Sequence, residues 1–203
     1  KSYRLSKAKN KTSNANSIIE KPTLFASIAS IKGSHYIAIP EYSSESRKYI
    51  PMLYLDKDVI ASNKLYMVDD GSLYEFGVLE SNVHMAWMRA VAGRLEMRYR
   101  YSKDIVYNNF PWPEDNDDLK EIISKTAQSI LDARALYPES SLADLYDELT
   151  MPVELRKAHQ VNDIAVMKAY GMIKKVDGKD TFLTESETVA RLFEMYQELT
   201  KKK

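Results

Sequence analysis

The chain has 203 residues, a length that permits one large domain or two small ones. Its 29 Lys and Arg residues balance 29 Asp and Glu residues, and it contains no cysteine, which excludes a disulfide framework and a cysteine-based zinc site. No apolar run approaches the roughly 18 residues that a membrane-spanning helix needs, so membrane insertion is not expected.

The formal charge is divided unevenly along the chain. Residues 1–113 hold 16 Lys and Arg against 11 Asp and Glu, a net charge of +5, whereas residues 114–203 hold 13 against 18, a net charge of −5. A basic part joined to an acidic part predicts that only the first part faces phosphate groups. Because the excess is modest, strong nonspecific binding to nucleic acid is not expected.

The first part of the chain is predicted to form a small sheet with one helix. Residues 1–20 are rich in Lys, Ser and Asn and are expected to form a linker, and residues 23–32 fit a strand or a helix equally well. Further along the chain we predict a strand at 35–40 and another at 49–55, which Pro51 places at a sheet edge. Apolar runs at 64–68 and 72–76 flank a predicted turn. A helix from Ser81 to about 92, a strand at 94–101 and an extended segment at 108–113 complete this part.

The second part of the chain, residues 114–203, is predicted to be mainly helical. Its predicted elements are helices at 114–136, 141–149, 152–170 and 185–199, with a small hairpin at 174–182. The fold class is therefore α+β: a small mixed or antiparallel sheet domain with one packed helix, followed by a mainly α-helical subdomain. The expected boundaries are 1–20 for the linker, 21–113 for the sheet domain and 114–203 for the helical domain.

The predicted strand at 94–101 carries an unusual alternation of side chains. Glu96, Arg98 and Arg100 share one face, while Leu95, Met97, Tyr99 and Tyr101 share the other and look like core. Arginine fits the O6/N7 edge of guanine and glutamate accepts from N4 of cytosine, so this face has the chemistry to read a C·G pair in a major groove. The alternative is an exposed strand with an ordinary Glu–Arg pair.

Two long runs of the sequence resemble a known family. They are His84-Met-Ala-Trp-Met-Arg-Ala-Val-Ala-Gly-Arg-Leu and Arg98-Tyr-Arg-Tyr-Ser-Lys-Asp-Ile-Val-Tyr-Asn-Asn-Phe-Pro-Trp-Pro113. Together with shorter stretches between about residues 20 and 200, they resemble the C-terminal region of MmeI-like (type IIG/IIL) restriction–modification enzymes. These single-chain proteins join an endonuclease, an adenine-N6 DNA methyltransferase and a target recognition domain.

The resemblance implies roles for particular residues. Glu96 and Arg98 correspond to a pair that reads one base pair of the target, and Lys64 and Arg100 correspond to a second pair. Surface cations near these positions are candidates for contacts to DNA phosphates, which position a protein without reading sequence. These candidates are Arg47, Lys48, Arg94 and Lys103.

No residue of this chain is predicted to be catalytic, to bind a cofactor or to bind a metal. The six glycines form no G-x-G motif, and Asn108-Asn-Phe-Pro111 lacks the Pro-Pro of an adenine methyltransferase motif. The three histidines form no i, i+4 pair; His84 is expected to be structural and His159 to lie on a helix surface or between helices.

The resemblance also implies partners and a setting. Double-stranded DNA and the methyltransferase domain of a longer chain are the expected partners, in a bacterial or archaeal cytoplasm. S-adenosylmethionine, and Mg²⁺ where a nuclease domain exists, would belong to that longer protein. The competing hypothesis is a structural module in which residues 93–103 bind an acidic protein.

Overall fold

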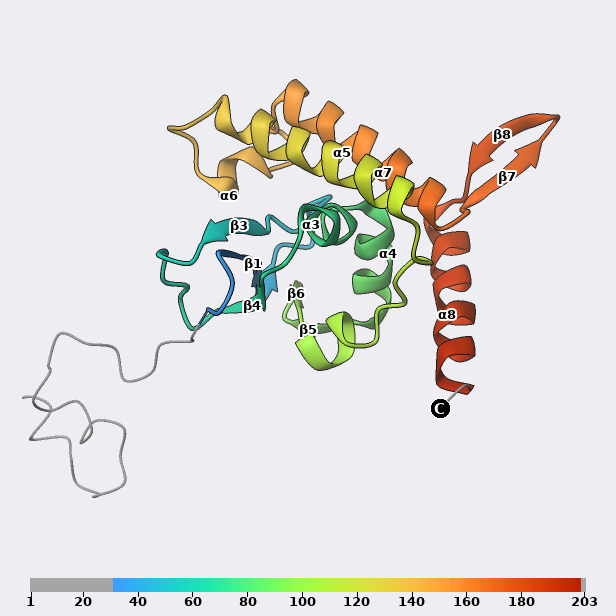
Figure 1. The fold of residues 1–203 in the computed structure, drawn as a ribbon, viewed down its shortest axis with the longest axis horizontal. Helices are drawn as coiled ribbons and strands as arrows, with labels where there is room; N and C mark the ends of the chain where they lie inside the picture. Colours follow the sequence, from blue (N-terminus) through green and yellow to red (C-terminus); the bar gives the residue numbers. More distant parts are fainter. Residues whose placement is uncertain (1–30, 202–203) are drawn as a thin grey trace, which may run out of the picture. The chain divides into compact units, whose positions relative to one another are not determined.

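The computed structural model describes residues 31–201 of the chain, and the described residues from 33 onward form one compact unit. The predicted linker at 1–20 and most of the ambiguous segment at 23–32 lie outside the described residues. Sheets and helices both occur in this unit, with the helices concentrated after residue 113 (Figure 1), so the predicted α+β class is confirmed.

A three-stranded antiparallel sheet comes first in the described chain. Its strands are β1 (His35–Pro40), β3 (Leu53–Asp56) and β4 (Leu65–Asp69), in the order β3-β1-β4. Strand β1 has the predicted bounds. Strand β3 lies at an edge as predicted, but it begins only at Leu53 because Pro51 has no N–H to give to a neighbouring strand.

A second antiparallel sheet joins segments that are far apart in the sequence. It consists of β2 (Tyr42–Ser43), β6 (Arg98–Arg100) and β5 (Gly93–Leu95), in the order β2-β6-β5. Glu41 links the two sheets through its backbone: its N–H donates to the carbonyl of Lys64 at 3.0 Å, and its own carbonyl accepts from the N–H of Tyr101 at 2.8 Å.

Two helices, rather than the single predicted one, lie between β4 and β5. They are α3 (Leu73–Leu79) and α4 (Asn82–Val91). We predicted the apolar run at 72–76 to follow a turn, but it starts α3 instead. The reason is a capping box, in which the side chains of Ser72 and Glu75 each accept a hydrogen bond from the backbone N–H of the other. Ser81 caps α4 as predicted, with its side chain accepting from the N–H of His84.

The segment after β6 packs on α4. It begins with a short π-helix, η1 (Lys103–Tyr107), which was not predicted. Trp87 donates its indole N–H to the carbonyl of Val106 at 3.0 Å. His84 is fully buried, with Nε2 3.0 Å from the hydroxyl of Tyr101, and burial lowers its pKa to about 3. The predicted structural role of His84 is therefore confirmed, and the ring is neutral at pH 7.

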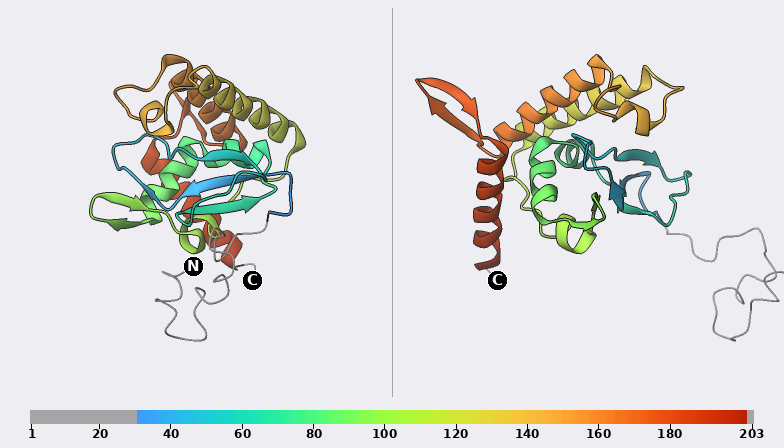
Figure 2. Two further views of the ribbon diagram at one scale, coloured as in Figure 1. Left: turned by 90° about the vertical axis from the view of Figure 1, so that its left-hand side faces the viewer. Right: turned by 180° about the vertical axis from the view of Figure 1, so that it is seen from behind.

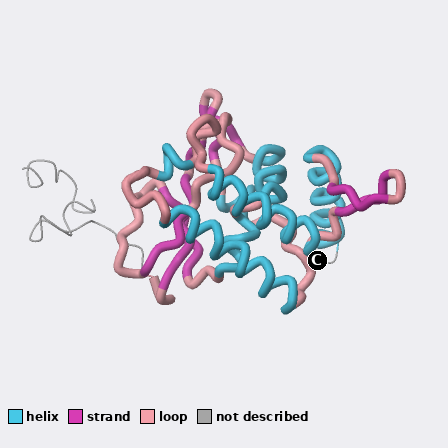
Figure 3. The backbone as a smooth tube through the Cα atoms, turned by 90° about the horizontal axis from the view of Figure 1, so that it is seen from above, coloured by secondary structure: helices cyan, strands magenta, loops and turns pink. Residues whose placement is uncertain are grey.

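The rest of the described chain is helical apart from one hairpin, as predicted. Helices α5 (Asp117–Ala135) and α7 (Val153–Ala169) lie side by side, with the short α6 (Leu142–Leu145) between them in sequence. Strands β7 (Ile173–Val176) and β8 (Lys179–Phe182) form a hairpin that projects beyond the helices (Figures 1 and 3). Within residues 31–201, no helix is both long and apolar enough to cross a membrane.

Helix α8 (Glu185–Lys201) returns to the sheet part of the chain and lies alongside α4 (Figure 2). The ring of Trp87 on α4 has its centroid 5.2 Å from that of Phe193 and 6.0 Å from that of Tyr196, both on α8. Helix α3 approaches α5 closely at Gly77, where an added Cβ would lie 2.7 Å from a methyl carbon of Ile123. The two predicted domains therefore share one core, and their boundary stays a prediction.

A buried ion pair also crosses that predicted boundary. Glu80, at the end of α3, has a fully buried side chain whose Oε1 accepts from Arg134 of α5 and from the N–H of Met52, each at 2.7 Å. Arg134 also donates to the carbonyl of Met52 at 2.7 Å and to the hydroxyl of Tyr146. Burial raises the pKa of Glu80 to about 7, although the charge of Arg134 opposes this rise.

The polar contacts continue into α7. The hydroxyl of Tyr146 lies 2.7 Å from Nε2 of His159, and the ring of His159 stacks on Tyr49 with centroids 4.1 Å apart. Tyr49 donates to Asp163 at 2.6 Å, and Asp163 accepts from the N–H of Asn82 at 2.7 Å. His159 is buried between elements, so its predicted interhelix position is confirmed and the surface alternative is wrong.

Replacing Arg134 with Met should leave Glu80 buried without its counter-charge and should lower the free energy of unfolding by about 3–5 kcal/mol. Urea unfolding followed by circular dichroism measures this loss. The double variant Arg134→Met, Glu80→Leu removes both charges and is expected to recover part of the loss, because two apolar side chains of similar volume carry no desolvation cost.

The loss should also depend on pH. The folded-state pKa of Glu80 lies above the ordinary glutamate value of 4.5, so its protonation favours the native state below pH 4.5, and this contribution fades as the pH rises through about 7. Without Arg134 the folded-state pKa rises further. The single variant should therefore lose less stability at pH 5 than at pH 8, and equal losses would contradict an unpaired Glu80 carboxylate as the cause.

Candidate functional site

The segment predicted as one strand at 94–101 is a tight hairpin, so that prediction is wrong. Strands β5 and β6 pair Leu95 with Arg98, and Glu96 and Met97 form the two-residue turn between them. Glu96 has a φ of +56°, in the left-handed region that side chains other than glycine seldom adopt. The left view of Figure 2 shows the hairpin extending outward from the rest of the chain.

The turn moves two predicted core residues to the surface. Leu95 is 45% exposed and Met97 is 64% exposed, because the alternation of one continuous strand breaks at the turn. Tyr99 and Tyr101 are buried as predicted. Arg98 and Arg100 are exposed, and as i, i+2 residues of β6 they lie on the same face.

Glu96 and Arg98 pair with each other at the tip of the hairpin. A guanidinium nitrogen of Arg98 lies 2.8 Å from Oε2 of Glu96, and the two side chains are 53% and 75% exposed, respectively. An ion pair this exposed contributes at most about 1 kcal/mol, since water solvates both partners. Breaking this ion pair to bind a ligand therefore costs Glu96 and Arg98 little free energy.

Lys64 and Arg100 come from distant segments, and Glu41 brings them together. The Glu41 carboxylate lies 3.2 Å from Nζ of Lys64 and 3.5 Å from Nε of Arg100. Its side chain is only 14% exposed, whereas those of Lys64 and Arg100 are 65% and 59% exposed. Glu41 was not predicted from the sequence, because its only local signal is its position directly after the proline that ends a strand.

The charge state of Glu41 follows from these neighbours. Partial burial raises the pKa of its carboxyl, but the hydrogen bonds from Lys64 and Tyr42 and the charges of Lys64 and Arg100 outweigh this effect and lower the pKa. Glu41 is thus a carboxylate at neutral pH that holds one ammonium and one guanidinium group at the outer face of the second sheet.

The four candidate phosphate-binding residues lie in different surroundings. Arg94 folds over the ring of Tyr99 at 4.3 Å and donates to the carbonyl of Met97 at 3.2 Å, so its guanidinium braces the turn. Lys48 lies over the ring of Tyr49, and Lys103 lies 3.8 Å from a carboxylate oxygen of Asp104. Arg47 is partly buried in the loop after β2.

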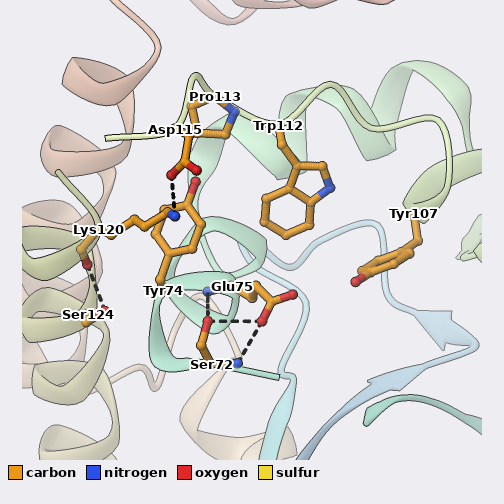
Figure 4. Close-up of a pocket in the computed structure, with 9 residues that line it drawn as sticks. All are labelled: Ser72, Tyr74, Glu75, Tyr107, Trp112, Pro113, Asp115, Lys120 and Ser124. Atoms are coloured by element: carbon orange, nitrogen blue, oxygen red, sulfur yellow. Dashed lines mark hydrogen bonds and ion pairs between the residues drawn. The ribbon is translucent and has the colours of Figure 1, made fainter. Parts of the chain in front are cut away.

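A cavity of about 650 Å³ lies between α3, the segment after η1 and the start of α5. Figure 4 shows the rings of Tyr74, Tyr107 and Trp112 around it, with Asp115 and Lys120 paired at one side. None of the candidate residues lines this cavity. Nor do the residues from 31 to 201 place three or more His, Asp or Glu side chains together as a metal site would require.

Comparison with known proteins gives consistent matches over the chain. Residues 1–114 match the family model described as "MmeI, target recognition domain", and residues 115–202 match that described as "MmeI, C-terminal domain". DNA methyltransferase A of Bacillus subtilis (strain 168) is 40% identical over 169 residues, which are 83% of this chain and 18% of that protein.

A solved structure of a longer relative is also similar. It is the structure of the type IIL restriction-modification enzyme MmeI in complex with DNA, which is 42% identical to this chain with a TM-score of 0.82. The match covers 98% of this chain and 25% of that one. The chain therefore spans only 18% and 25% of the lengths of the two relatives.

The Glu41 cluster can be tested by NMR titration of the Glu41 carboxyl group. Its pKa should lie below the ordinary glutamate value in the wild-type chain and should rise in both Lys64→Met and Arg100→Met. The larger rise is expected in Lys64→Met, because Lys64 donates a hydrogen bond as well as its charge. An unchanged pKa in both variants would contradict the cluster.

Proposed function

Because the chain belongs to the MmeI target recognition domain family, we propose that it reads the base sequence of double-stranded DNA in the major groove. The observation that carries this proposal is the Glu96–Arg98 pair, an exposed acceptor and donor at the tip of a projecting hairpin.

The chemistry of the pair suits one kind of base pair. The guanidinium of Arg98 matches the two acceptors O6 and N7 of guanine, and the carboxylate of Glu96 accepts from the N4 amino group of cytosine. In the free chain the two side chains satisfy each other at 2.8 Å. On binding, each exchanges its partner for a base edge, so hydrogen bonds to a C·G pair replace the ion pair and no donor or acceptor is left unsatisfied.

Lys64 and Arg100 form a second reading pair in this proposal. Both are hydrogen-bond donors, which suits the acceptors on a purine edge, and Glu41 holds them in place before DNA arrives. Arg47, Lys48, Arg94 and Lys103 would contact phosphates, which fix the register of the hairpin on the duplex. For Arg94 this contact would add to its role in bracing the turn.

The remaining steps belong to a longer protein. We infer a linker at 1–20 that follows a methyltransferase domain, a recognition domain at 21–113, and a helical domain at 114–203 that braces it and packs on the methyltransferase. That protein would transfer a methyl group from S-adenosylmethionine to a flipped adenine, and it would need Mg²⁺ if it also cleaves DNA. Its setting would be a bacterial or archaeal cytoplasm.

A second function is compatible with the exposed cations of β6. Arg98 and Arg100 lie on one face of the hairpin, together with the exposed Lys64, and could instead bind an acidic protein. Such a module would bind its partner in a salt-sensitive manner and would show no preference among DNA sequences.

Exchanging the chemistry of the first pair tests the proposal. In the full-length enzyme, Glu96→Lys with Arg98→Asp should change the preferred base at one position of the target from C to G and leave all other positions unchanged, because Lys donates where Glu accepted and Asp accepts where Arg donated. Selection from a randomised duplex library, followed by sequencing, measures the preference.

A matched control exchanges an exposed ion pair away from the hairpin. Glu194→Lys with Arg191→Asp alters a pair of 3.2 Å on α8 and should leave every position of the preferred sequence unchanged. If the hairpin exchange abolishes binding and creates no new preference, Glu96 and Arg98 are a structural pair and the proposed reading is wrong.

A further inference from the structure

Two apolar side chains are exposed beside the proposed reading pair. Leu95 precedes Glu96 and Met97 follows it, and their exposed fractions are 45% and 64%. Tyr99 of the same hairpin lies in the hydrophobic core, but neither Leu95 nor Met97 is among the described residues that form the core or pack against it. The stability of the fold therefore does not account for two large apolar residues at this tip.

Their positions relative to Arg98 are fixed by the hairpin. Leu95 is the cross-strand partner of Arg98, so the two side chains share a face with their Cβ atoms roughly 5 Å apart. Arg94 donates to the carbonyl of Met97 at 3.2 Å and stacks on the buried Tyr99, which anchors the turn. The apolar tip and the charged pair would therefore approach a ligand as one unit.

The major groove offers one apolar group among its base edges, the C5 methyl group of thymine. Successive bases of one strand lie about 3.4 Å apart, so a Cβ spacing of roughly 5 Å allows Leu95 to contact a base next to the one that Arg98 contacts. We propose that Leu95 and Met97 recognise a pyrimidine C5 methyl group within one base pair of the pair contacted by Glu96 and Arg98. This inference rests on the proposed function and adds a second kind of base contact to the same hairpin.

The two side chains suit different parts of this contact. Leu95 lies on a strand and is held by its pairing with Arg98, so it is the principal contact with the methyl group. Met97 lies in the turn on the other side of Glu96 in sequence. Its unbranched, flexible side chain can adapt its conformation to contact the same methyl group. Truncating Leu95 should therefore reduce methyl recognition more than truncating Met97.

The experiment changes single methyl groups of the DNA. Once a preferred duplex has been selected, each thymine within one base pair of the Glu96–Arg98 position is replaced by deoxyuridine and each cytosine by 5-methylcytosine, and affinities are measured at fixed salt with the full-length enzyme. If the recognised position is a thymine, its replacement by deoxyuridine should weaken binding by the wild type about fourfold, the value of one buried methyl group. If the position is a cytosine, its replacement by 5-methylcytosine should strengthen binding by a similar factor.

The variant Leu95→Ala, Met97→Ala should bind the methylated and unmethylated duplexes equally well while keeping the preference for C·G at the Glu96–Arg98 position. The matched control Ile173→Ala, Val176→Ala truncates two exposed apolar residues of the β7–β8 hairpin and should retain the fourfold effect. The wild-type measurement alone decides the question if the double variant does not fold.

Each outcome bears on a different claim. A duplex that is selected with a fixed C·G pair but is insensitive to every nearby C5 methyl group would overturn this inference and leave the proposed function intact. Methyl sensitivity that persists in the double alanine variant would also overturn it. Selection without any preferred sequence would overturn both, and self-association that is lost in the variant would show that the tip contacts a second copy of the chain instead.

Discussion

The buried ion pair between Glu80 and Arg134 is the contact on which the arrangement of this chain depends. A charge without a partner is costly in a protein interior, so Glu80 and Arg134 must become buried together. Their further partners are the backbone of Met52 and the side chain of Tyr146, which come from separate segments of the chain. The sheet part and the helical part can therefore complete their core only by forming it jointly.

This shared core fixes the surface that we propose reads DNA. Tyr99 of strand β6 and Tyr101, directly after the strand, lie in the core, and the hydroxyl of Tyr101 reaches the buried His84 at 3.0 Å. Because alternate residues of a strand face opposite sides, these anchors determine where Arg98 and Arg100 point. Because the backbone of the strand is held in this way, only the exposed side chains need to become ordered when they bind, which favours discrimination between base pairs.

Much of this fold could be predicted from local signals in the sequence. The Ser81 cap, the acidic first turn after residue 113 and the 3.6-residue periodicity indicated α4, α5, α7 and α8 within a few residues, and an apolar run ending in proline indicated β1. Helix α3 was missed although its signal was present, since Ser72 and Glu75 have the spacing of a capping box. These elements are determined by neighbours in the sequence.

The site itself depended on contacts that the sequence does not reveal. The alternation through 94–101 continues across the turn at Glu96 and Met97, where no glycine or asparagine marks a left-handed residue, so the strand looked unbroken. Glu41 contacts residues 23 and 59 positions away, and Glu80 contacts one 54 positions away. Such long-range pairs required coordinates, whereas the family resemblance had already singled out Glu96, Arg98, Lys64 and Arg100.

The most direct test of the account is selection of the purified 203-residue chain against a randomised duplex library at low salt. We expect enrichment of a short motif that contains a fixed C·G pair, because the proposed reading side chains and the core that positions them all lie within this chain. Measurable binding with no enriched motif would contradict it, since the chain would then hold DNA through its phosphates alone.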